Sequence, residues 1–405
     1  MYNFDELVPR EGTDSYKLKY LEEICGRDDV IPMWVADMDF RTPPFVIRAL
    51  EKRVRQGIMG YTCSNDAYYQ AICQWNKQQY GVEVKPDEVT YVPGVVSGIF
   101  LAIQTFTEKG DRILIQQPVY HPFRLVPEAT DRKVVMSPLR RTEDGFEMDF
   151  SQLRHDIEGC KMMILCNPHN PAGICWSRET LCEVAHICAE AGVLVVSDEI
   201  HCDMVLPNSL QKKHIPFASV SEEARQHSIT LQAPSKTFNM PGIVAAQAIV
   251  YNPDLRNRYF SYIEGTDQDL GNVFAYECAA ACYSAEGDEW RREMLSYVSA
   301  NIDVLCDRMK TECPLIRPLR PDASFLVFLD CTALMDKLTH GAPRDAAAQQ
   351  KLIRFFADEA HVAFNSGEMF GEGGIGFMRM NVACPQSVVM QAIDQIVAAC
   401  NRLNS

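Results

Sequence analysis

Three polar side chains with complementary chemistry each follow a short apolar run that is typical of a buried strand. The runs are residues 229–231 before Lys236, 193–197 before Asp198 and 161–166 before Asn170. Ligands of open α/β sheets bind at the carboxyl ends of strands, so we expect the three side chains to share one site. A lysine, a carboxylate and an amide suit a pyridine ring that carries an aldehyde. The amine would form a Schiff base, the carboxylate would keep the ring nitrogen protonated, and the amide would bond the ring hydroxyl.

Each of the three residues also has an ordinary structural interpretation. An isolated lysine is most often solvated at the surface. An aspartate at the end of a strand is a common cap for the helix that follows. An asparagine among prolines and a glycine is a common turn residue. The occurrence of all three at strand ends favours the shared site over these alternatives.

A second pattern suits a phosphate group, which binds backbone N–H donors at a helix N-terminus. Residues 94–98 read Gly-Val-Val-Ser-Gly and precede a predicted helix over 99–106. The candidate phosphate contacts are Val95, Val96, Ser97 and Ser235. Residues 239–247 contain no arginine, so the phosphate charge must be balanced by another part of the protein.

The composition limits the function classes. A net charge of −15 argues against nucleic acid or an anionic membrane as a partner. No apolar run approaches the roughly 18 residues of a membrane span. The start of the chain lacks the basic flank and apolar run of a signal peptide. Sixteen scattered cysteines suggest small buried side chains in a reducing compartment, so we expect a cytoplasmic protein.

The chain of 405 residues is long enough for two domains. Helical and strand patterns alternate over 46–285, which predicts a large α/β domain with a mostly parallel sheet. Six strands are predicted there, at 112–115, 133–135, 161–166, 193–197, 229–231 and 246–251. Residues 286–405 form a predicted smaller α+β domain, with a long amphipathic helix from about residue 288. Residues 1–45 form a predicted N-terminal arm that contributes to the small domain.

The chain resembles the fold-type I family of pyridoxal 5′-phosphate (PLP) enzymes. Asn-Pro-His-Asn-Pro-Ala-Gly at 167–173, Ser-Asp-Glu-Ile-His at 197–201 and Ser-Lys-Thr-Phe-Asn at 235–239 occur in that family's order. More narrowly, it resembles the cystathionine β-lyases of the PatB/MalY type. The narrower resemblance rests on residues 32–40, 60–62, 118–123 and 379–381. It implies a PLP cofactor and a mostly parallel seven-stranded sheet in the large domain. One departure is Leu18-Lys19, where the family has a Trp-Asp pair in its arm.

The resemblance also implies roles for single residues. Tyr120 would stack on the cofactor ring, Arg379 would bind the substrate carboxylate, and Trp34 and Asn170 would contact the substrate. His201 would lie beside the cofactor. Tyr61 would reach the phosphate from a neighbouring subunit, so each site of a homodimer would be shared. Lys236, Tyr61 and Tyr120 would be the catalytic groups.

A metal site is another interpretation of five cysteine and histidine residues. Its candidate ligands are Cys166, His169, Cys175, His201 and Cys202. Their spacings fit no common structural zinc site, so no metal is expected.

The reaction implied by the resemblance is PLP-dependent β-elimination on S-substituted L-cysteines such as L-cystathionine. Its products would be a thiol (homocysteine), pyruvate and ammonia. The shared motifs leave a class I/II aminotransferase as an alternative, because the same residues serve both reactions. A lyase with an added regulatory binding role is a further alternative.

Overall fold

The computed structural model describes residues 2–209 and 213–403. Its centre is a seven-stranded sheet with the order β2-β10-β9-β8-β7-β3-β4. The strands, in chain order, are β2 (Val89–Val92), β3 (Arg112–Gln117), β4 (Lys133–Pro138), β7 (Cys160–Cys166), β8 (Leu194–Asp198), β9 (Ser228–Gln232) and β10 (Ala246–Ile249). β10 is antiparallel to β2 and to β9, and the other pairs of strands in this sheet are parallel. The predicted α/β class and the seven-stranded, mostly parallel sheet are therefore confirmed. β2 is the strand that the sequence pattern missed.

Helices cover both faces of this sheet. On one face α5 (Val95–Phe106), α6 (Pro122–Ala129) and α10 (Pro253–Gly265) pack against side chains such as Ile164 and Val196. On the other face α7 (Phe150–Asp156), α8 (Arg178–Glu190) and α9 (Glu222–Gln226) pack against Met163 and Val195. Successive strand residues point to opposite faces, so continuous apolar runs are required for a sheet covered on both sides.

Local signals determine several helix ends near the sheet. Ser177 caps α8, because its hydroxyl accepts a hydrogen bond from Thr180 N–H at 3.2 Å. Gly192 follows the helix with a φ of 65°, which favours glycine. α5 begins at Val95, four residues before the predicted start at Ile99. The predicted phosphate loop is therefore the first turn of the helix itself.

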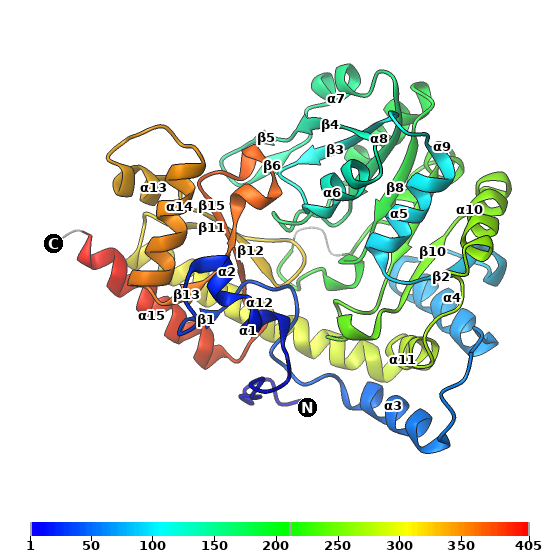
Figure 1. Cartoon of the computed structure of the whole chain (residues 1–405), viewed down its shortest axis with the longest axis horizontal. Coiled ribbons are helices and arrows are strands. Elements are labelled where there is room, and N and C mark those ends of the chain that lie inside the picture. The colour runs from blue at the N-terminus through cyan, green and yellow to red at the C-terminus, as the bar shows by residue number, and fades with distance from the viewer. Residues whose placement is uncertain (1, 210–212, 404–405) are drawn as a thin grey trace.

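The C-terminal part contains a second sheet, which is antiparallel and has the order β11-β12-β15-β14. Its strands are β11 (Arg317–Leu319), β12 (Leu326–Asp330), β14 (Asn365–Ser366) and β15 (Phe377–Asn381). The helices around it are α12 (Ala285–Glu312), α13 (Thr332–Thr339), α14 (Ala346–Arg354) and α15 (Gln386–Arg402). Figure 1 shows the long α12 running past both sheets. The remaining helices are α3 (Pro44–Gln56), α4 (Asp66–Tyr80) and α11 (Ala275–Cys282), and β5 (Arg140–Arg141) pairs with β6 (Phe146–Glu147).

The N-terminal arm lies against this C-terminal part (Figure 1). It contains α1 (Tyr16–Lys19), α2 (Leu21–Cys25) and β1 (Ile31–Pro32), and β1 pairs with β13 (Val362–Ala363). The three domain ranges given above stay a prediction, and residues 1, 210–212, 404 and 405 of those ranges lie outside the described part. No helix in the described ranges is long and apolar enough to cross a membrane.

Candidate active site

The carboxyl ends of β7, β8 and β9 border a cavity of about 230 Å³. Most of the predicted site residues line it. They are Val95, Val96, Ser97, Tyr120, Asn170, Asp198, His201, Ser235 and Lys236. The strand register places Cys166, Asp198 and Leu231 in one row across the three strands. Strand pairing therefore brings Asn170, Asp198 and Lys236 to one cavity wall, as the sequence pattern predicted, although Asn170 and Lys236 are 66 positions apart in the chain.

Lys236 lies in the turn that follows β9. Its Nζ donates a hydrogen bond to the carbonyl oxygen of Ala36 at 2.8 Å. Burial and the positive charge of Arg379 lower the pKa of Lys236 to about 8, against the opposing pull of Asp37 and Asp198. About a tenth of the amine is therefore neutral at pH 7, far more than for an ordinary lysine, and a nucleophile or a general base must be neutral.

Asp198 ends β8 and is 4% exposed. Its Oδ1 accepts a hydrogen bond from Ile200 N–H at 3.0 Å. Burial, with a smaller contribution from Glu199, raises the pKa of Asp198 to about 7, although the Ile200 bond opposes this shift. A buried carboxylate with this pKa is stabilised as an anion by a cationic N–H partner in the cavity. A protonated pyridine nitrogen is a cationic N–H partner of this kind.

Arg379 on β15 is a buried cation, and no carboxylate within the described ranges forms an ion pair with it. One terminal nitrogen donates to Asn170 Oδ1 at 3.0 Å. The other donates to Asn365 Oδ1 at 2.5 Å and to the Trp34 carbonyl at 3.3 Å. The Nε–H is buried without a partner, and burial lowers the pKa of Arg379 to about 10. The guanidinium can therefore take a ligand carboxylate as its counter-ion.

The hydrogen bond from Arg379 also orients the amide of Asn170. Because Oδ1 of Asn170 accepts that bond, its Nδ2 is directed as a donor. Tyr120 lies next to this amide: its backbone N–H donates to the Asn170 carbonyl at 3.1 Å. Tyr120 is partly buried and lines the cavity, and burial raises the pKa of its phenol. The phenol therefore stays protonated at neutral pH.

The anion-binding end of the cavity is formed by α5. Gly94 caps this helix with a φ of 96°, and Val95, Val96 and Ser97 form its first turn. The N–H groups of a first helical turn have no acceptor within the helix, so they are available to an anion. Ser235 lies on the same cavity wall. His201 adds an Nδ1 that is buried without a hydrogen-bond partner, and burial lowers the pKa of this imidazole to about 3. These features fit a phosphorylated pyridine.

Two of the predicted residues are placed differently. The Trp34 indole donates to the Lys17 carbonyl at 2.9 Å and packs against Tyr16, so the carbonyl of Trp34, and not its ring, reaches Arg379. Tyr61 is fully exposed at 101% and does not line the cavity of its own chain. The substrate role of Trp34 and the shared role of Tyr61 stay predictions.

Some residues at the site were not identified from the sequence. Ala36 supplies the carbonyl that meets Lys236, and Asn365 holds Arg379. Ala36 belongs to the segment 32–40 on which the family resemblance rests, so that motif was an available signal for it. Asn365 has no local signal, because it meets Arg379 through the pairing of β14 with β15. Among the described residues no group of three or more His, Cys, Asp or Glu side chains could hold a metal ion.

Comparisons with known proteins agree with this geometry. The profile of the aminotransferase class I and II family matches residues 28–396. Cystathionine beta-lyase PatB of Bacillus subtilis is 37% identical over 98% of this chain and 99% of its own length. Protein MalY of Escherichia coli is 32% identical over 98% of this chain and 99% of its own length. The PLP-bound C–S lyase of Staphylococcus hominis has a similar structure, with a TM-score of 0.89 and 30% identity over 98% of each chain.

These matches extend over almost the whole chain, including the three strand ends and Arg379. They bear out the resemblance that was drawn from the motifs. The chain therefore belongs to the aminotransferase class I and II family, and within it to the group of cystathionine beta-lyases that includes PatB and MalY.

Proposed function

We propose that the protein is a PLP-dependent carbon–sulfur lyase that acts by β-elimination on S-substituted L-cysteines such as L-cystathionine. One observation carries the proposal: Lys236, Asp198 and Asn170 line one cavity beside the unpaired cation of Arg379. The similarity to proteins named as cystathionine beta-lyases and C–S lyases supports this reaction over others of the family.

The cavity residues have distinct roles in holding the cofactor. Asp198 would hold the ring nitrogen, and the Asn170 amide would donate to the ring oxygen. The first turn of α5 and Ser235 would bind the phosphate, and Tyr120 would cover the ring. His201 closes the wall near Lys236. When bound, PLP supplies an electron sink that makes the Cα proton of an amino acid removable.

The substrate is oriented and deprotonated by this chain's own residues. Arg379 binds the α-carboxylate and so aims the Cα–H bond at Lys236. The Lys236 amine, with a pKa of about 8, takes that proton at Nζ. The electron pair of the Cα–H bond then forms a double bond between Cα and Cβ. The bond between Cβ and sulfur breaks, and its electron pair leaves with the thiolate. Water then converts the three-carbon remainder to pyruvate and ammonia.

The measurement that tests this proposal separates it from transamination. Purified protein supplied with PLP and cystathionine should release a thiol, pyruvate and ammonia in equal amounts. A β-elimination needs no keto acid, whereas an aminotransferase turns over only with a keto-acid acceptor and forms a new amino acid. Strict dependence on a keto acid would replace the lyase proposal with the aminotransferase.

We also infer that the protein is a homodimer in which Tyr61 completes the site of the partner. Exposed apolar side chains surround this tyrosine in sequence, namely Ile58 at 66% and Met59 at 52% exposure, and Ile47 and Val54 on α3 are exposed as well. A patch of this kind is typical of a protein–protein contact. Tyr61 in trans would also supply a phosphate contact where residues 239–247 have no arginine.

A cytoplasmic location is the remaining part of the proposal. All sixteen cysteines lie in the described ranges and are free, and most are buried. Free thiols in this number suit a reducing compartment.

A further inference from the structure

The segment of residues 34–40 borders the cavity at Ala36 and forms neither a helix nor a strand. Side chains from other parts of the chain bind its carbonyl oxygens instead. Asn381 donates to Val35 and Asp37, Asn239 donates to Met38 and Phe40, and Lys236 donates to Ala36. The segment is thus held from β15, from the loop after Lys236 and from Lys236 itself.

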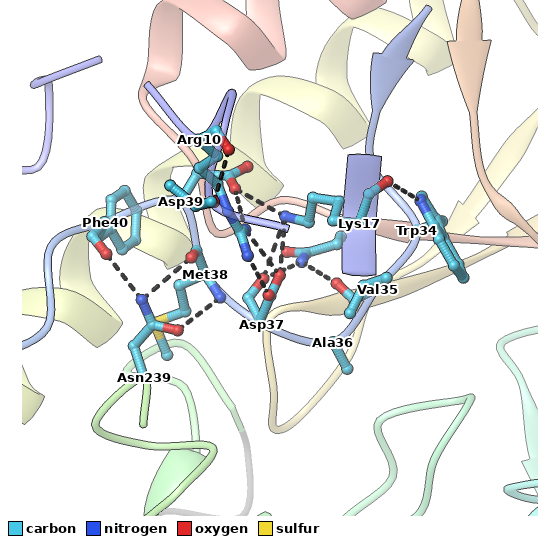
Figure 2. A network of polar contacts seen from close by, with 12 residues as sticks. Arg10, Lys17, Trp34, Val35, Ala36, Asp37, Met38, Asp39, Phe40 and Asn239 are labelled. Atoms are coloured by element: carbon cyan, nitrogen blue, oxygen red, sulfur yellow. Dashed lines mark hydrogen bonds and ion pairs between the residues drawn. The ribbon is translucent and has the colours of Figure 1, made fainter. Parts of the chain in front are cut away.

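The N-terminal arm holds the same segment by its two carboxylates (Figure 2). Arg10 donates to Asp37 at 2.6 and 3.1 Å and to Asp39 at 2.9 Å. Lys17 donates to Asp39 Oδ1 at 2.9 Å and to the Asp37 carbonyl at 3.3 Å. The Lys17 side chain is 1% exposed, although lysine is rarely buried unless it is paired.

The charges of this group balance. Two cations, Arg10 and Lys17, face two carboxylates, Asp37 and Asp39. Removal of one cation leaves an uncompensated carboxylate that is only 14% or 24% exposed. Such a charge is unfavourable, so the segment would shift toward water. Ala36, the neighbour of Asp37, would shift with it.

We propose that Lys17 and Arg10 are positioning residues for the reaction. They fix Asp37 and Asp39, and so hold the neighbouring Ala36 carbonyl in place. That carbonyl orients the Lys236 amine whenever the amine is not bonded to the cofactor. The inference rests on the proposed function, in which the freed amine must face the substrate Cα. A carbonyl at 2.8 Å orients Nζ and stabilises it after it has gained the proton. Neither Lys17 nor Arg10 lines the cavity, so both act through the segment.

The charged groups that face Lys236 come from three elements. They are Asp198 at the end of β8, Arg379 on β15 and Asp37 in the segment. His201 stays neutral at working pH, since its pKa is about 3. The change Lys17→Met leaves Asp37 and Asp39 with one cation, so the segment shifts and takes the Ala36 carbonyl and the Asp37 carboxylate away from Nζ. Both groups stabilise the ammonium form, and Lys17 is not one of the charges that face Nζ, so the pKa of Lys236 should fall.

The test uses the full-length protein without cofactor, so its readout does not depend on turnover. An amine-specific reagent is applied across a pH series, and mass spectrometry follows modification of the Lys236 peptide. The wild-type midpoint is expected near pH 8. For Lys17→Met the midpoint should fall by about one pH unit, as expected when an ammonium loses a hydrogen-bond acceptor and a nearby carboxylate. Lys19→Met is the matched control, because Lys19 lies on the same helix but is 61% exposed. Its ion pair with Asp14 is long, at 3.9 Å, and Asp14 is exposed as well. The Lys19→Met midpoint should equal that of the wild type.

A Lys17→Met midpoint equal to the wild type, in protein with a normal thermal unfolding curve, would overturn the proposal. If Lys17→Met does not fold, Arg10→Met replaces it, since Arg10 is 26% exposed and its loss has the same sign. An unshifted midpoint in Arg10→Met would then be decisive. In the holoenzyme, kcat should fall about tenfold for Lys17→Met or Arg10→Met, because a small misplacement of the Lys236 amine slows proton transfer. The wild type's release of pyruvate tests the lyase separately: a shifted midpoint without pyruvate refutes the reaction and leaves the positioning role.

Discussion

Replacement of Arg379 by lysine tests how the substrate is bound. A guanidinium has five N–H donors, and hydrogen bonds to Asn170, Asn365 and Trp34 use three of them. Two donors, including the unpaired Nε–H, remain for a carboxylate. A lysine ammonium has only three donors. If it keeps its bonds to Asn170 and Asn365, one donor remains, so the variant loses one charge-assisted hydrogen bond to the substrate.

The size of the loss follows from that count. One hydrogen bond to a charged group contributes about 1.5–3 kcal/mol, which corresponds to roughly a 10- to 150-fold fall in kcat/KM. The assay is pyruvate release over a range of cystathionine concentrations, with the visible absorbance of the bound cofactor recorded in parallel. The absorbance should stay unchanged, because Arg379 does not line the cofactor cavity.

Arg141→Lys is the matched control for this experiment. Both arginines stack on a phenylalanine at 4.9 Å, Arg379 on Phe370 and Arg141 on Phe377. Arg141 pairs with Asp330 and does not line the cavity, so its change to another cation should leave kcat/KM within about twofold of the wild type. An unchanged kcat/KM in Arg379→Lys would remove Arg379 from the substrate site. A loss of the cofactor absorbance would instead assign it to cofactor binding.

Three further predictions concern other site residues. Borohydride treatment of the yellow holoenzyme should abolish the visible band and leave the reduced label on Lys236; a label on another lysine would contradict its assignment. Refolding Tyr61→Ala chains together with Lys236→Ala chains should restore activity well above either parent, because a mixed dimer has one native site if Tyr61 acts in trans. No recovery, in a sample where mixed dimers are detected and refolded wild type is active, would count against the shared site. Without cofactor, Asp198→Asn should unfold at a higher temperature than the wild type at pH 8. The wild type loses stability as pH rises from 3.8 to about 7, because Asp198 holds its proton only in the folded state over that range, and the difference between the two proteins should vanish near pH 4.

The sequence was informative where function depends on strand ends. The apolar runs before Asn170, Asp198 and Lys236 are required by a sheet that is covered on both faces, and parallel pairing then brings their ends together. Because pattern and topology both follow from burial, local residues were sufficient to predict this part of the site. β2 was missed because Val89–Val92 is short and lies at the edge of the sheet, where the apolar pattern is weak.

The start of α5 was predicted too late for a different reason. Gly98 was interpreted as part of a glycine-rich loop, but it lies within the helix. A Cβ at this position would lie 2.9 Å from Leu231 Cδ2, so glycine is required by close packing of the helix on β9. The residue that looks like a loop signal therefore allows the phosphate-binding helix to approach the strand that leads to Lys236.

The surroundings of Lys236 could not be predicted from local patterns because they depend on contacts between distant parts of the chain. Ala36 is 200 residues from Lys236, and its position depends on Lys17, Asn239 and Asn381. Asn239 and Asn381 belong to the motifs 235–239 and 379–381, but nothing in those motifs shows that both residues bind the segment 34–40. Lys17 on its own would be placed in solvent. Its burial is stable only because Asp37 and Asp39 meet it there. The sheet edge thus supplies the groups that react with the cofactor, whereas the arm, through paired charges, controls how the lysine amine is oriented.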